Sequence, residues 1–171
     1  MKKIVAVFVL FFALNLQAQK IPAVMKTEFT AKALTQKLLT QDGKKLSVKE
    51  IFAKHPKKII LIDFWASWCR DCILVLPKTK ELLERFPNLD VVYFSVDRSE
   101  EQWKKGLEKY GISDKENYFF EEGWKNEFTN TIDLNWVPRF ILVDSTGKIA
   151  HYYATSPSDE ALINSIEELL K

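Results

Sequence analysis

Apolar runs along the chain predict four strands near the centre and end of the sequence. Residues 59–65 are apolar at nearly every position, which is typical of a central strand covered on both faces. Residues 91–96 form a similar run. Residues 140–143 and 149–154 flank the turn signal Asp144-Ser145-Thr146-Gly147, so they predict a hairpin.

Apolar residues spaced three or four apart predict helices between these strands. One helix follows residue 69 and contains Pro77, which should kink it. Ser99 begins another helix with a favourable cap, and residues 124–132 show a shorter helical pattern. Ser156, followed by Pro157, is the expected start of the last helix.

The segment before residue 59 carries weaker signals. Residues 37–40 and 44–47 flank Asp42-Gly43, which predicts a hairpin. Ser47 and Glu50 have the spacing of a capping box at the start of a short helix. Residues 27–31 indicate a short strand. Alternating strands and helices, followed by a hairpin and a closing helix, predict a mixed sheet with helices on both faces.

The N-terminus differs in kind from the rest of the chain. Lys2 and Lys3 precede an apolar run at residues 4–14, and Ala18 offers a small residue for cleavage. This pattern is typical of a secretory signal peptide, and the run is shorter than the ~20 residues that span a bilayer. We expect residues 1–18 to be a signal peptide and 19–171 a single soluble domain outside the cytoplasm. An uncleaved N-terminal anchor is the alternative.

Composition and charge exclude one class of partner. Of the 25 basic residues, two lie in the predicted signal peptide, which leaves 23 against 23 acidic residues. A near-neutral chain with interspersed charges has no electrostatic footprint for nucleic acid. Export implies an oxidising compartment, where cysteines are commonly paired.

The chain has two cysteines, Cys69 and Cys72, at the predicted junction of a strand and a helix. The positive end of a helix dipole favours a thiolate, so this spacing indicates redox chemistry. A purely structural disulfide is disfavoured because it would close a loop of only four residues. A metal pair is disfavoured because His55 and His151 lack ligand spacing. Asp63 lies in the apolar run, where a carboxylate is costly without a partner.

Three features together resemble the thioredoxin fold. They are the run 63–72, which reads DFWASWCRDC, Pro77 behind it, and Val137-Pro138 before the final hairpin. The predicted signal peptide, the hairpin around Asp42-Gly43 and the helical stretch after Asp97 resemble the exported TlpA/ResA-type branch. The resemblance covers about residues 35–171. It implies a central mixed sheet flanked by helices, with an N-terminal hairpin extension and a helical insertion before a cis-proline strand.

The resemblance also implies roles for the residues around the cysteines. Cys69 would be the nucleophile and Cys72 the resolving cysteine, and the two would form a disulfide. Asp63 matches the buried acid that exchanges a proton with the resolving cysteine, although pairing with Lys57 or Lys58 is the alternative.

The same resemblance implies a substrate-binding surface. Pro138 matches the cis-proline, Val137 would offer backbone groups to a substrate chain, and Trp68 would provide a flat apolar contact. Trp65 is expected to serve packing, and Trp103, Trp124 and Trp136 are expected in the core.

Three charged residues are candidates for redox tuning. Arg70 should favour the Cys69 thiolate and Asp71 should oppose it. Arg139 would bring positive charge near Cys69 or steer an acidic partner. The alternative for all three is a solvent-facing side chain.

The sequence therefore predicts an exported thiol-disulfide oxidoreductase that reduces protein disulfides without a cofactor or metal. It would act as a monomer with a membrane-bound thiol electron donor. About 40 residues separate Asp97 from Pro138, which leaves no room for the larger helical domain of DsbA-type oxidants. The alternative is a non-catalytic binding module, or one that delivers copper through its two thiols.

Overall fold

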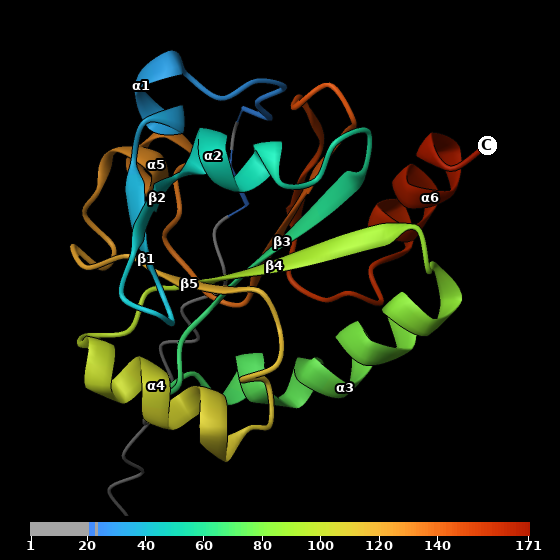
Figure 1. Ribbon diagram of the computed structural model, residues 1–171. Coiled ribbons are helices and arrows are strands. Elements are labelled where there is room, and N and C mark those ends of the chain that lie inside the picture. Colours follow the sequence, from blue (N-terminus) through green and yellow to red (C-terminus); the bar gives the residue numbers. More distant parts are fainter. Residues whose placement is uncertain (1–20, 23) are drawn as a thin grey trace, which may run out of the picture.

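The computed structural model describes residues 21–22 and 24–171 of the chain (Figure 1). Seven strands form one sheet in the order β2-β1-β5-β4-β3-β6-β7. The strands are β1 (Lys37–Thr40), β2 (Lys45–Ser47), β3 (Ile59–Trp65), β4 (Leu89–Ser95), β5 (Asn117–Phe119), β6 (Arg139–Val143) and β7 (Ile149–Ala154). The helices are α1 (Ala31–Leu34), α2 (Val48–Ala53), α3 (Arg70–Arg85), α4 (Glu100–Lys109), α5 (Glu127–Thr131) and α6 (Glu160–Leu169).

Strand β3 is the centre of the sheet. All seven of its residues are buried, and it pairs in parallel with β4 and antiparallel with β6. Ile59 and Leu61 pack with residues of α3 and α6. Ile60, Ile62 and Phe64 belong to the larger core cluster, which also includes residues of α1, α2 and α5. The predicted mixed sheet with helices on both faces is therefore confirmed.

Helices α3 and α4 lie along one side of the sheet, whereas α1, α2 and α5 lie on the other (Figure 1). The N-terminal hairpin is confirmed, because β1 and β2 pair around a turn in which Gly43 has a φ of +82°. The Ser47–Glu50 capping box is present at the start of α2. Ser99 caps α4 by accepting the backbone N–H of Gln102.

Three local expectations are corrected. Residues 27–31 do not form a strand, because the side chain of Thr30 caps a helix that begins at Ala31. The last helix begins at Glu160, where Asp159 accepts two backbone N–H groups, and not at Ser156. Strand β5 has no counterpart in the sequence prediction. It pairs with β1 and β4, which are distant in sequence.

The predicted signal peptide, residues 1–18, lies outside the described residues. In the part of the chain that the structure describes, no helix has the length and apolar character needed to cross a membrane.

Candidate active site

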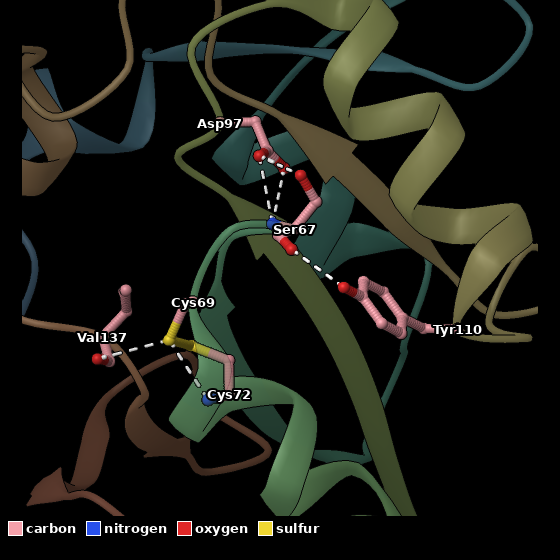
Figure 2. Close-up of a disulfide and its surroundings, with 6 residues drawn as sticks. All are labelled: Ser67, Cys69, Cys72, Asp97, Tyr110 and Val137. Atoms are coloured by element: carbon pink, nitrogen blue, oxygen red, sulfur yellow. Dashed lines mark hydrogen bonds between the residues drawn. A yellow bond between two sulfur atoms is a disulfide. The ribbon is translucent and has the colours of Figure 1, made fainter.

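Cys69 and Cys72 lie where the chain leaves β3 and enters α3 (Figure 2). They form a disulfide with their Cα atoms 5.3 Å apart. Cys69 is the N-cap of α3, and its Sγ accepts the backbone N–H of Cys72 at 3.1 Å. The helix start thus directs a hydrogen-bond donor and a positive dipole end at this sulfur, which would stabilise a Cys69 thiolate after reduction.

The loop before β6 reaches the same sulfur from the other side. The Val137–Pro138 peptide bond is cis. The carbonyl oxygen of Val137 lies 3.6 Å from Sγ of Cys69 (Figure 2). Two segments that are 68 residues apart in sequence therefore meet at the disulfide.

Asp63 is buried in the middle of β3. Neither of its carboxylate oxygens has a hydrogen-bond partner, and neither Lys57 nor Lys58 pairs with it among the described residues. Burial raises the pKa of Asp63 from the usual 3.8 to about 8, because the charged form loses its water without gaining a partner. The alternative of a lysine pair is therefore not what the structure shows.

Tyr93 is the neighbour of Asp63 on the adjacent strand β4. Burial and, secondarily, the negative charge of Asp63 raise the pKa of the Tyr93 hydroxyl above its usual value of 10.0. The tyrosine therefore stays neutral and shares the low-polarity surroundings that keep Asp63 protonated at neutral pH.

A group that the sequence analysis missed holds the loop between β3 and Cys69. Asp97, at the end of β4, accepts the Ser67 backbone N–H at 3.0 and 3.1 Å and the Ser67 hydroxyl at 2.7 Å. Oδ2, which also accepts the Ser67 N–H, accepts the Ser95 hydroxyl at 2.8 Å. The hydroxyl of Tyr110, the residue that caps the C-terminus of α4, donates to the Ser67 carbonyl at 3.2 Å (Figure 2). The sequence offered one clue to this role, because Asp97 comes directly after the buried strand that was predicted at residues 91–96.

Replacing Asp97 by asparagine is expected to lower the free energy of unfolding by about 2–4 kcal/mol. Hydrogen bonds to a charged acceptor are worth about 1.5–3 kcal/mol each, and an amide turns one acceptor into a donor that faces the Ser67 N–H. Urea denaturation measures the change. Glu108→Gln removes an exposed carboxylate of α4 and serves as the control. Equal stability of the two variants would contradict the role of Asp97.

The three charged candidates for redox tuning differ in how far their side chains are exposed. Arg70 and Asp71 are exposed in the first turn of α3, beside the cysteines. Arg139 is 1% exposed, so the alternative that its side chain faces solvent is wrong. Its guanidinium donates to the Tyr152 carbonyl at 2.8 and 3.2 Å and stacks on the rings of Tyr152 and Tyr153. These neighbours on β7 explain how the arginine is buried.

The tryptophans divide between the core and the surface around the disulfide. Trp65 and Trp103 are fully buried, as expected. Trp68 is 48% exposed, and its ring lies 6.3 Å from that of the half-buried Trp124. Trp136 was expected in the core but is 39% exposed. Trp68 and Trp136 directly precede Cys69 and Val137 in the chain, so an exposed tryptophan adjoins each of the two segments that meet at the disulfide.

Within residues 21–22 and 24–171, no group of three or more histidine, cysteine or acidic side chains is arranged to hold a metal ion. The reactive groups that the described residues place at this site are the Cys69–Cys72 pair, the buried Asp63 on the strand that leads to it, and the backbone of the cis-proline loop.

Comparison with known proteins agrees with this chemistry. A family model described as thioredoxin-like matches residues 57–149. The thiol-disulfide oxidoreductase ResA of Bacillus anthracis is 22% identical over 130 residues, which cover 75% of this chain and 70% of ResA. The solution structure of a candidate thiol-disulfide oxidoreductase from Bacteroides vulgatus is 30% identical, with a TM-score of 0.67 over 83% of this chain and 90% of that one.

A more distant structure shares the fold. A secreted disulfide oxidoreductase of Mycobacterium tuberculosis is 17% identical, with a TM-score of 0.59 over 82% of this chain and 100% of that one. The segments that carry Cys69, Asp63 and Pro138 all lie inside the matched range of the family model.

Proposed function

The chain belongs to the thioredoxin-like family, and on this premise we propose that it is an exported oxidoreductase that reduces the disulfide bonds of other proteins. The predicted fold class and the general activity, thiol-disulfide oxidoreduction, agree with its relatives. The observation that carries the proposal is the Cys69–Cys72 disulfide at the start of α3, in contact with the Val137 carbonyl.

The reaction begins with the reduced protein. The Cys69 thiolate attacks one sulfur of the substrate disulfide, which releases one substrate thiolate and forms a mixed disulfide. Cys72 gives its proton to the ionised form of Asp63, which is the minor form at neutral pH because the pKa is about 8, and attacks Sγ of Cys69. The second substrate thiolate then leaves and takes up the proton that Asp63 received. Two electrons pass to the substrate, and the Cys69–Cys72 disulfide returns.

Asp63 suits this role because its carboxyl group titrates near the pH at which thiols titrate. Its pKa of about 8 lies close to the ordinary value of about 8.5 for a cysteine thiol, so a proton moves between the two groups with little cost. An ordinary exposed aspartate would be too weak a base for the same transfer.

Substrate binding would use the surface around the sulfur. The backbone of Val137, held by the cis bond to Pro138, would pair with an extended substrate segment. The exposed rings of Trp68 and Trp136 would cover apolar side chains on either side of the substrate disulfide. Arg70 and Asp71, both exposed beside Cys69, remain the candidates for tuning its potential.

The reducing direction, the compartment and the electron donor complete the proposal. Between β4 and β6 the chain forms only α4, β5 and α5, so no large helical domain is inserted there. Residues 1–18 would direct export, and residues 19–171 would act as one monomeric domain. A membrane-bound thiol protein would restore the dithiol in the oxidising compartment.

The alternative, a non-catalytic module that binds a partner or delivers copper, needs only the two thiols. It gives no reason for an unpartnered buried acid on the strand that leads to the cysteines, so Asp63 favours catalysis. Copper bound in a stoichiometric amount by the reduced protein, with no disulfide reduction, would support the alternative.

A trapping experiment tests whether the substrate is a protein. Reduced Cys72→Ser protein keeps Cys69 but cannot resolve the mixed disulfide, so it should form a stable adduct with an insulin chain. We expect this adduct to form about tenfold faster than the adduct with oxidised glutathione, because an insulin chain offers a longer extended backbone to pair with Val137 than a tripeptide does. Mass spectrometry after acid quenching gives both rates.

The double variant with Cys69→Ser and Cys72→Ser is the control and should form neither adduct. Reaction with glutathione alone would contradict a protein substrate.

A further inference from the structure

A hollow of about 370 Å³ opens beside the disulfide loop. It lies between Trp68, Arg98, the α4 residues Lys105 and Lys109, and Tyr110 at the C-terminal end of that helix. Trp68 is the residue directly before Cys69, so anything bound in the hollow touches the segment that carries the nucleophile.

The floor of the hollow is rigid. A Cβ atom on Gly106 would lie 2.5 Å from Cβ of Ser67, so α4 packs directly against the loop at this glycine. The Tyr110 hydroxyl holds the Ser67 carbonyl, and Asp97 holds the Ser67 amide and hydroxyl. A ligand in the hollow therefore meets a surface that is already ordered.

All the charged side chains that line the hollow are basic. Its ionisable side chains are Arg98, Lys105, Lys109 and Tyr110, with no acidic residue among those that line it. Lys105 is paired with Glu101 at 2.6 Å. Neither Arg98 nor Lys109 has an ion pair within the part of the chain that the structure describes, and residues 1–20 contain no aspartate or glutamate.

The carboxylate of Asp97, the residue before Arg98, is already engaged. The Asp97 carboxylate is 1% exposed and accepts hydrogen bonds from Ser67 and Ser95. It holds the loop and has no ion pair with Arg98. Two exposed cations thus stand next to an aromatic wall, which is an arrangement suited to a carboxylate.

The hollow and the Val137 loop lie on opposite sides of the disulfide segment. Figure 2 shows Val137 on one side of the stretch from Ser67 to Cys72 and Tyr110 on the other. A substrate strand that pairs with Val137 and presents its disulfide to Cys69 would continue across Trp68 toward the cations.

We propose that this hollow binds an acidic side chain that flanks the disulfide of the substrate protein, so that the enzyme prefers disulfides with a nearby aspartate or glutamate. The inference rests on the proposed function and adds a substrate preference to it. The attraction is between partly exposed charges, so it should be moderate and sensitive to salt.

Peptides test the preference directly. Two peptides with one disulfide each differ only in having glutamate or glutamine two residues from the attacked cysteine. The pre-reduced full chain is mixed with each in a single turnover, and the second-order rate constant is measured at low ionic strength. We expect the glutamate peptide to react about three- to tenfold faster, with the ratio approaching one near 1 M salt.

Variants locate the effect. Arg98→Gln and Lys109→Gln should each lower the ratio at least about twofold, and the double variant should bring it close to one. Lys104→Gln is the matched control, because Lys104 lies on the same helix outside the hollow and pairs with Glu100 at 2.7 Å. It removes the same charge and should keep the ratio of the wild type.

The outcomes separate the two claims. A wild-type ratio near one, or an equal fall in Lys104→Gln, overturns the acidic preference while the proposed function stands. Failure to reduce either peptide overturns both.

Discussion

Replacing Cys69 by serine is expected to reduce insulin reduction to the rate of the dithiothreitol donor alone. Serine has no thiolate to attack a disulfide, and its hydroxyl is a far weaker nucleophile at neutral pH. The turbidity of precipitating insulin chains measures the rate. Activity equal to that of the wild type would show that Cys69 is not the nucleophile.

The loss should be chemical and not structural. Serine is among the best N-cap residues, so its Oγ can accept the Cys72 N–H as the sulfur does. Loss of the disulfide removes a constraint on a loop of four residues, worth about 2 kcal/mol in the chain-entropy treatment. Cys72→Ser loses the same constraint but keeps the nucleophile. It is therefore the matched control, with no turnover but a stable adduct.

Features with local causes could be predicted from the sequence. The Ser47–Glu50 box and the Asp42-Gly43 turn depend on residues within four positions of one another, and both are present. The strand before Cys69 was predictable because every residue from 59 to 65 is buried on a central strand. The spacing of Cys69 and Cys72 predicted the redox site that follows this strand.

Features that depend on distant partners could not be predicted. Strand β5 has three residues and exists because β1 and β4 supply hydrogen bonds on either side. Arginine is usually found at the surface, but Arg139 is covered by the rings of Tyr152 and Tyr153. Asp97 becomes part of the site only because the ends of β3 and β4 are parallel neighbours. In each case the surroundings of the residue are set by tertiary packing, and they differ from those that its residue type favours.

Replacing Asp63 by asparagine is expected to stabilise the oxidised protein by an amount that grows with pH. In the folded protein the carboxyl group of Asp63 has a pKa of about 8, whereas in the unfolded chain it loses its proton near the usual 3.8. Between these values the folded state binds more protons, so wild-type stability falls as pH rises. The variant lacks this group. Its advantage should therefore be small at pH 4, grow by about 1.4 kcal/mol per pH unit, and level off above pH 8.

Urea denaturation at pH 4, 6, 8 and 9 measures this difference, which should reach the order of 5 kcal/mol. Asp144→Asn is a control of opposite sign. Hydrogen bonds from Thr146 and Lys148 lower the pKa of Asp144 despite partial burial, so its carboxylate stabilises the fold above the unfolded pKa and that variant should lose stability there. A pH-independent difference for Asp63→Asn would show that Asp63 ionises normally.

The same variant should be a slower enzyme. Without the carboxyl group, Cys72 must lose its proton to water, so release of the mixed disulfide should slow by about 10²-fold at pH 7. The wild-type release rate should rise with pH through about 8 as Asp63 becomes a base, and the variant should lack this inflection. Ionisation of Asp63 in the unfolded chain lowers the stability of the fold above about pH 4. Such a proton-transfer step is the best explanation for a residue with this cost. Unchanged release kinetics in a stabilised variant would remove that explanation.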